Sequence, residues 1–168
     1  MLRMVTFDLG HTILDEERDR EVELSVRPAF PMPGVMDALP QIRLPMGIWA
    51  NTTAATADDV RQWLRRAALD HFFSCIVTST DAGYRKPDRR FFLHALATCG
   101  CRADEVLFVG NQLNSDIAGA NACAILSVFL TDHAYRSRDD TKVNTKPTYS
   151  IGTLKELPEL LARIGIHV

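Results

Sequence analysis

Asp8, Lys86 and Asp116 each lie beyond a short apolar run, and their side chains suit chemistry on a charged ligand. Carboxylate oxygens are the hard ligands that a divalent cation prefers. An ammonium group can offset the negative charge of a phosphate while a carboxylate attacks it. Brought together by one fold, two carboxylates and one ammonium would form a site for a divalent cation and a phosphate. Each residue alone indicates little, because a lone aspartate after a strand more often forms a turn or caps a helix.

Short apolar runs alternate with helical patterns along the chain, an order typical of βαβ units and a parallel sheet. Most of the runs are unbroken, as expected for strands that helices cover on both faces. The expected strands are Met4–Phe7, Met46–Ala50, Cys75–Thr78, Val106–Val109, Ala124–Leu130 and Tyr149–Ile151. Ligands of an open parallel sheet bind beyond the carboxyl ends of its strands, so the loops that follow these runs are the place to look for a site.

The clearest helix follows Thr56, which has the spacing of a helix cap with Asp59. Its apolar positions recur at helical spacing and form one stripe, at Val60, Trp63, Leu64, Ala67 and Ala68. Further helices are expected from Pro87 to Gly100, around Leu157–Ile164 and, shorter, between Gly34 and Ile42.

Two polar segments stand apart from this pattern. Residues Asp15–Glu23 are nearly all charged, and the alternation of Val22, Leu24 and Val26 predicts a half-exposed strand. Residues Thr131–Thr148 are polar without periodicity and predict a long surface loop. A solvated surface is favoured over a functional role for both segments.

Length and composition indicate a single globular domain over residues 1–168. The chain is 46% hydrophobic and 24% charged, with a net charge of −2 and no internal repeat. Binding driven by nucleic-acid phosphates is disfavoured because the basic residues do not gather. The N-terminus lacks the apolar core of a signal peptide, and no stretch approaches the roughly eighteen apolar residues of a membrane span. The cysteines (Cys75, Cys99, Cys101 and Cys123) form no CxxC pair and are interpreted as reduced residues of a cytoplasmic protein.

Four motifs in a fixed order resemble those of the haloacid dehalogenase superfamily, whose members are mainly phosphotransferases. They read VTFDLGHTI, GIWANT, GYRKPDRRFF and EVLFVGNQLNSDIAGA. The stretch from Pro33 to Leu130 also resembles the phosphoglycolate-phosphatase-like branch. The resemblance covers nearly the whole chain and implies a doubly wound α/β sheet with strand order 5-4-1-2-3.

The resemblance also implies roles for individual residues. Asp8 would attack phosphorus in line and form an aspartyl-phosphate that water then hydrolyses, while Lys86 neutralises charge on the phosphoryl group. The implied ligands of Mg²⁺ are Asp8, the backbone carbonyl of Gly10, Asn111 and Asp116. The residues implied in phosphate binding are Thr12, Asn51, Thr52 and Lys86. The partner would be a phosphorylated substrate of unknown identity.

Three positions depart from the family's pattern. Gly10 replaces the usual acid–base aspartate, a loss worth typically ~10²–10⁴-fold in rate. His11 is the nearest substitute, but it occupies the family's glycine position, and a packing or exposed histidine is favoured. Ala50 replaces a hydroxyl residue that binds the phosphate, and Thr52 could reach in, although capping of the next helix is favoured. Asn111 replaces an acid, so weakened Mg²⁺ affinity is expected.

These departures leave two hypotheses for function. The first is a phosphomonoester hydrolase that acts slowly through Asp8; the second is a catalytically silent module that keeps the fold for binding or regulation. The stretches from Asp8 to Ala50 and from Ala50 to Lys86 are too short to hold a cap domain. An open site is therefore expected, covered at most by Asp15–Val26, by Thr131–Thr148 or by a second subunit of a homo-oligomer. Such a site suits bulky or macromolecular phosphoesters and argues against dehalogenase chemistry.

Overall fold

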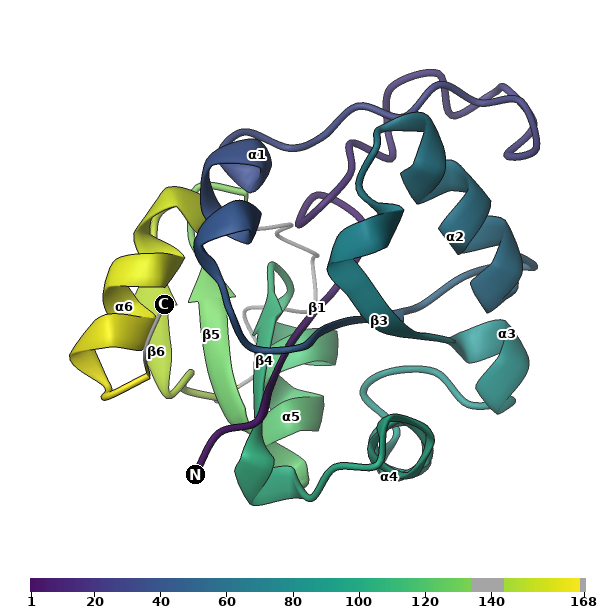
Figure 1. Cartoon of the computed structure of the whole chain (residues 1–168). Helices are drawn as coiled ribbons and strands as arrows, with labels where there is room; N and C mark the ends of the chain where they lie inside the picture. Colours follow the sequence, from purple (N-terminus) through teal and green to yellow (C-terminus); the bar gives the residue numbers. More distant parts are fainter. Residues whose placement is uncertain (134–143, 167–168) are drawn as a thin grey trace.

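The six strands found among the described residues pair into one parallel sheet. In spatial order they are β3 (Phe73–Thr78), β2 (Met46–Ala50), β1 (Met4–Phe7), β4 (Val106–Gly110), β5 (Leu126–Leu130) and β6 (Tyr149–Ile151). The computed structural model describes residues 1–133 and 144–166 of the chain. The predicted order 5-4-1-2-3 is confirmed, and β6 extends the sheet beyond β5 (Figure 1). The chain changes direction of winding between β3 and β4, so the switch point lies between β1 and β4.

Helices cover both faces of this sheet. One face carries α1 (Val35–Ala38), α2 (Ala57–Arg66) and α6 (Leu157–Arg163), and the other carries α4 (Arg89–Cys99) and α5 (Ala118–Ala122), with α3 (Ser79–Ala82) beside α4 (Figure 1). Short 3₁₀ turns span Leu39–Gln41, Asp70–Phe72, Ala103–Glu105 and Leu154–Glu156, and a π-helical turn spans Leu113–Ile117. Strand β1 shows the division into two cores, because Val5 and Phe7 pack with the first set of helices and Met4 packs with the second.

Helix boundaries follow from capping side chains. The predicted cap of α2 is confirmed: the Thr56 hydroxyl accepts from the Asp59 amide at 3.3 Å, and the Asp59 carboxylate accepts from the Thr56 amide at 2.9 Å. Helix α4 ends at Gly100 in the left-handed region, also as predicted. It begins at Arg89 rather than at Pro87, because the Asp88 carboxylate caps it by accepting from the Arg90 amide at 2.9 Å.

Within the part of the chain that the structure describes, no cap domain is inserted between the strands. Between β1 and β2 the chain forms a loop, α1 and one 3₁₀ turn, and between β2 and β3 it forms only α2 and one 3₁₀ turn. The loop contains residues 15–30, called the covering segment below, whose ends are tied together where the Asp15 amide donates to the Phe30 carbonyl at 2.9 Å. Figure 1 shows it passing beside α2.

The strand expected around Val22, Leu24 and Val26 is not formed. The backbone there makes turns, with the amides of Val22 and Val26 donating to carbonyls three residues earlier. Arginines satisfy the carbonyls that a neighbouring strand would otherwise bind: Arg66 donates to Leu24 at 2.7 Å and Arg27 donates to Val22 at 2.9 Å.

The expected surface loop lies partly outside the described residues, which omit 134–143; residues 144–147 form no helix or strand. Among the residues that the structure describes, none of the helices is long and apolar enough to cross a membrane.

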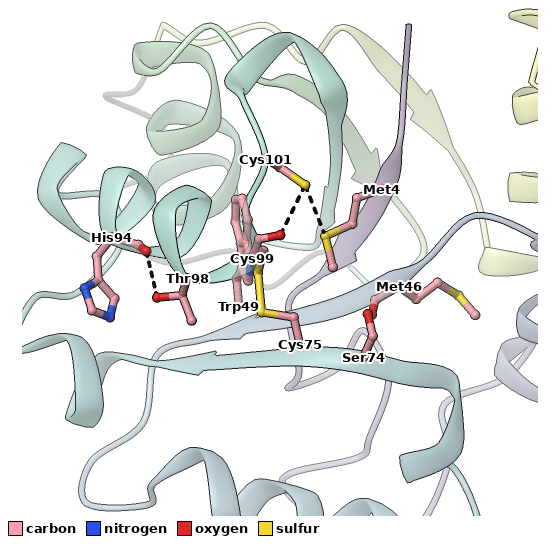
Figure 2. Close-up of a disulfide and its surroundings, with 9 residues drawn as sticks. All are labelled: Met4, Met46, Trp49, Ser74, Cys75, His94, Thr98, Cys99 and Cys101. Carbon is pink, nitrogen blue, oxygen red and sulfur yellow. Dashed lines mark hydrogen bonds between the residues drawn. A yellow bond between two sulfur atoms is a disulfide. The ribbon is translucent and has the colours of Figure 1, made fainter.

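Two of the four cysteines are joined, which corrects the interpretation of all four as reduced. Cys75 on β3 and Cys99 at the end of α4 form a disulfide with their Cα atoms 5.9 Å apart, a separation typical of disulfides (Figure 2). Cys101 and Cys123 are free thiols. Because the pairing depends on how α4 packs against β3, no spacing in the sequence signals it. A cytoplasmic location remains a prediction.

Candidate functional site

Three charged side chains from distant loops meet beyond the carboxyl ends of β1 and β4. The Lys86 ammonium donates to Asp8 Oδ1 at 2.6 Å, to Asp116 Oδ1 at 2.8 Å and to the Trp49 carbonyl at 2.8 Å. All three charged residues are buried, with exposed fractions of 4% for Lys86, 6% for Asp8 and 1% for Asp116. Buried charges need such pairing, because isolated ones would pay a large desolvation cost.

Backbone contacts place the two carboxylates. Asp8 continues the ladder between β1 and β4, its amide donating to the Val109 carbonyl at 2.9 Å. Asp116 comes from the π-helical turn, and its Oδ2 accepts from the amides of Asn111 at 3.1 Å and Gln112 at 3.0 Å. The close approach requires a glycine at Gly110, since a Cβ there would lie only 2.5 Å from Asp116 Cβ.

Lys86 is positioned by the side chain of Asn51. Asn51 Oδ1 accepts from the Lys86 amide at 2.8 Å, and Asn51 Nδ2 donates to the Lys86 carbonyl at 3.0 Å. The predicted phosphate-binding residue Asn51 thus uses its amide group to hold the loop that presents the ammonium.

The other two expected phosphate-binding side chains differ in their surroundings. The Thr52 hydroxyl donates to the Ala55 carbonyl at 2.8 Å and lies 2.8 Å from the Thr80 hydroxyl, so it shapes its own loop. It does not cap α2, since Thr56 does. Thr12 is buried, and its Oγ1 has no hydrogen-bond partner within the described residues.

The charges in this cluster act on one another. Burial would lower the pKa of the Lys86 ammonium, but the charges of Asp116 and Asp8 and their hydrogen bonds outweigh burial and raise it. Burial and then repulsion by Asp8 raise the pKa of Asp116 to about 6, against the opposing effect of Lys86. Lys86 is therefore firmly protonated, and the carboxylates around it repel each other.

Glu16 brings a third carboxylate to the same place from the covering segment. A Cβ built on Gly10 would overlap the Glu16 carboxylate, whose farther oxygen Oε1 lies 2.9 Å from it. Asp15 forms the turn that places Glu16, its Oδ1 accepting from the amides of Glu17 at 3.0 Å and Arg18 at 3.1 Å. Burial and then the charge of Asp8 raise the pKa of Glu16 to about 7. The sequence interpretation, which treats Asp15–Glu23 as solvated surface, misses this residue.

His11 lines the same hollow but lies in a different environment. Its backbone is in the left-handed region, with φ of 54°, which fits its place at the family's glycine position. Its Nε2 lies 3.9 Å from a Glu17 carboxylate oxygen, and about a quarter of its side chain is exposed. The hollow has a volume of about 50 Å³ and is lined by Asp8, Gly10, His11, Glu16, Asn51, Lys86, Gln112, Ser115 and Asp116.

The oxygen donors around the hollow fit a magnesium ion in part. Asn111 is fully buried and is not among the residues that line the hollow: its Nδ2 donates to the His133 carbonyl at 2.9 Å, and its Oδ1 has no hydrogen-bond partner within the described residues. Mg²⁺ is usually held by one or two carboxylates together with substrate phosphate, and Asp8 supplies a carboxylate here. Both oxygens of Asp116 already accept hydrogen bonds. Among the described residues, no group of three His, Cys, Asp or Glu gathers as a metal site.

Similar proteins include several phosphatases. The glyceraldehyde 3-phosphate phosphatase of Methanothermobacter thermautotrophicus is 32% identical over 105 residues, covering 61% of this chain and 46% of that protein. The ribulose-1,5-bisphosphate 5-phosphatase of Halopiger xanaduensis is 33% identical over 117 residues, covering 67% of this chain and 49% of that protein. The chain thus spans about half the length of the curated relatives that it matches.

Solved structures share the fold. An uncharacterized protein from Listeria monocytogenes serotype 4b superposes with a TM-score of 0.83 at 21% identity, covering 97% of this chain and 98% of that one. A HAD phosphatase from Thermococcus onnurineus gives a TM-score of 0.75 at 20% identity, covering 99% of this chain and 100% of that one. The family model for haloacid dehalogenase-like hydrolases matches residues 3–124, which include every motif residue described above. The chain therefore belongs to the haloacid dehalogenase-like hydrolase family.

Proposed function

We propose that this chain hydrolyses phosphate monoesters through an aspartyl-phosphate on Asp8. The observation that carries the proposal is the buried contact of the Lys86 ammonium with both Asp8 and Asp116 at the switch point of the sheet. An Asp8 oxygen attacks phosphorus, the bond between phosphorus and the ester oxygen breaks, and the alcohol leaves with a proton. Water then attacks the phosphorus of the aspartyl-phosphate, which releases inorganic phosphate and regenerates Asp8.

In this proposal Lys86 and Mg²⁺ both stabilise the negative charge of the phosphoryl group. The Lys86 ammonium stays charged and lies against the nucleophile, where it offsets the negative charge that builds up on the phosphoryl group. Asp8, the Gly10 carbonyl and Asn111 Oδ1 would hold Mg²⁺, which supplies Lewis-acid polarisation of the phosphoryl oxygens. Asp116 acts behind them by fixing Lys86 and the backbone of Asn111. The neutral Asn111 donor supports weaker Mg²⁺ binding than an acid would give.

Glu16 takes the place of the missing acid–base residue in this proposal. Its carboxylate lies in the space that a side chain at Gly10 would enter, beside the nucleophile. Protonated, Glu16 would give its proton to the leaving oxygen; ionised, it would accept a proton from the attacking water. The relatives' activities support a phosphorylated substrate, and Glu16 removes one of the three objections to catalysis that the sequence raises.

The experiment that tests this function is magnesium-dependent hydrolysis of acetyl phosphate by the full chain. Its leaving group needs little proton donation, so the assay reports on Asp8 rather than on Glu16. Asp8→Asn should lower turnover by at least ~10³-fold, in line with the loss of a covalent nucleophile. Asp37→Asn, which removes an exposed carboxylate on α1, is the matched control and should leave turnover unchanged. Absence of turnover in the wild type would favour a silent binding module instead.

A further inference from the structure

A second and larger hollow adjoins the one around Lys86. It has a volume of about 370 Å³, against about 50 Å³ for the first, and Glu16 and Asn51 line both. A hollow of about 50 Å³ has the size for a phosphoryl group but not for the organic part of an ester as well. A group attached to the phosphate would therefore extend past Glu16 into the larger hollow. Small-molecule pockets have volumes of about 300–1,000 Å³, and the larger hollow falls within this range.

The inner wall of the larger hollow is apolar. Leu9, Val60 and Trp63 are each no more than 2% exposed, and Leu24 from the covering segment packs against the same core. Burial of an apolar group against such a wall is favourable at roughly 25 cal/mol per Å² removed from water. This part of the lining favours a leaving group with an apolar face, and Asn51, Thr52 and Thr53 supply a polar part of the same lining.

The covering segment is held against α2 by hydrogen bonds from side chains of that helix. The Arg66 guanidinium donates to the carbonyls of Leu24 and Arg27 at 2.7 and 3.3 Å and also contacts the Ser25 carbonyl. The Trp63 indole donates to the Pro28 carbonyl at 3.0 Å. The covering segment thus forms the outer wall of the larger hollow as a fixed part of the fold. The site is therefore less open to solvent than the lack of a cap domain suggests.

Charges around the larger hollow disfavour a second anionic group. Glu16 and Glu17 line it, and the guanidinium of Arg27 is the one cationic group among its lining residues. Arg27 already donates to the carbonyls of Val22 at 2.9 Å and Arg20 at 2.6 Å. These bonds use two of the five N–H donors of Arg27, so what disfavours a second anion is the pair of carboxylates, Glu16 and Glu17, against one guanidinium.

We infer that the larger hollow binds the leaving group of a small phosphate monoester whose organic part is uncharged and partly apolar. This inference rests on the proposed function for its placement of the phosphate. It replaces the macromolecular phosphoester that the sequence favours, and it disfavours bisphosphates. The covering segment, rather than a cap domain, selects the substrate.

Phosphonates test this inference without turnover, because their phosphorus–carbon bond resists hydrolysis. Binding of phenylphosphonate, methylphosphonate and 4-carboxyphenylphosphonate to the wild-type chain with Mg²⁺ would be measured by calorimetry. Phenylphosphonate should bind at least about tenfold more tightly than methylphosphonate, and the added carboxylate should remove that advantage. Equal affinities for the phenyl and methyl compounds, or tightest binding of the carboxyphenyl compound, would overturn the inference.

A substitution at the rim locates the binding. Ala54 is exposed and lines the larger hollow, so Ala54→Trp should fill it without disturbing the core. The variant should lose the preference for phenylphosphonate and keep its affinity for methylphosphonate within about twofold. Ala97→Trp, on the exposed side of α4 at the opposite face of the sheet, is the matched control and should keep the preference. A preference that survives Ala54→Trp would contradict the inference, whereas acetyl phosphate hydrolysis separately decides the proposed function.

Discussion

The carboxylate of Glu16 occupies the space into which a side chain at Gly10 would project. A side chain at position 10 and the Glu16 carboxylate therefore cannot occupy this space together, so only one of the two positions can bring a carboxylate to Asp8, the proposed nucleophile. This relationship explains how the chain can lack an acid at position 10 and still place one in the hollow. It also means that an aspartate restored at position 10 must be accompanied by a smaller residue at position 16.

The first prediction is that Glu16 performs the acid–base role that a carboxylate at position 10 would otherwise have. Glu16→Gln should lower kcat for phenyl phosphate, whose phenolate leaving group needs a proton, by ~10²-fold or more. It should lower kcat for acetyl phosphate, whose leaving group is acetate, far less. The double variant Gly10→Asp/Glu16→Ala should recover at least part of the loss, while Gly10→Asp alone should not. A Glu16→Gln variant as active as the wild type toward phenyl phosphate would remove Glu16 from the chemistry.

Stability should depend on pH through the same residue. Because the pKa of Glu16 is raised from 4.5 to about 7 on folding, the folded chain favours its protonated form. That contribution is complete below about pH 4.5 and is lost as pH rises through 7, so ionised Glu16 destabilises the chain above that pH. Glu16→Gln should raise the free energy of unfolding at pH 8 by up to about 3 kcal/mol relative to its effect at pH 5.

Urea denaturation of both chains with a chelator present measures this difference. Glu17→Gln, whose carboxylate is exposed, is the matched control and should show no comparable change. If the free energies of unfolding of the wild type and Glu16→Gln differ by the same amount at pH 5 and at pH 8, ionised Glu16 does not destabilise the fold.

The positions of the buried strands along the chain could be predicted from their unbroken apolar runs, whereas the order of the strands in the sheet was implied by the family resemblance. The convergence of Asp8, Lys86 and Asp116 followed from the rule that ligands bind at strand ends. Charged turns were harder, since Asp15–Glu23 has the composition of solvated surface. Only the three-dimensional path of the chain shows that Glu16 turns back toward Gly10.

Contacts between residues far apart in the sequence could not be predicted either. The bond of Cys75 to Cys99 depends on packing of α4 against β3, and the turns around Leu24 depend on hydrogen bonds from Arg66. Neither contact has a signature in the local sequence, because in each case the two residues that interact are far apart in the chain. Thr52 is a residue type that can cap a helix or bind an anion, yet its hydroxyl donates to the Ala55 carbonyl.

Removal of the central ammonium should destabilise the fold. Lys86→Met would leave Asp8 and Asp116 buried without their shared partner, and loss of one member of a buried ion pair costs about 3–5 kcal/mol. Lys155→Met breaks an exposed pair with Asp37 and should cost less than about 1 kcal/mol. Chemical denaturation compares the two, and equal effects would show that the cluster around Lys86 is not the buried pair described.

Reduction should weaken the chain through its disulfide. The bond of Cys75 to Cys99 closes a loop with a sequence separation of 24, and its loss should lower the free energy of unfolding by about 3 kcal/mol. Dithiothreitol should destabilise the wild type and leave a Cys75→Ser/Cys99→Ser variant unchanged. Titration of four free thiols in the unreduced, denatured chain would show that the bond does not form.

The central claim is that Asp8 becomes phosphorylated during turnover. The direct measurement is intact mass spectrometry of the chain after acid quenching during acetyl phosphate hydrolysis with Mg²⁺, followed by mapping of the modified peptide. The account predicts a species heavier by one phosphoryl group, located on Asp8 and missing from Asp8→Asn. Sustained turnover by Asp8→Asn, or a phosphoryl group on any other residue, would contradict it.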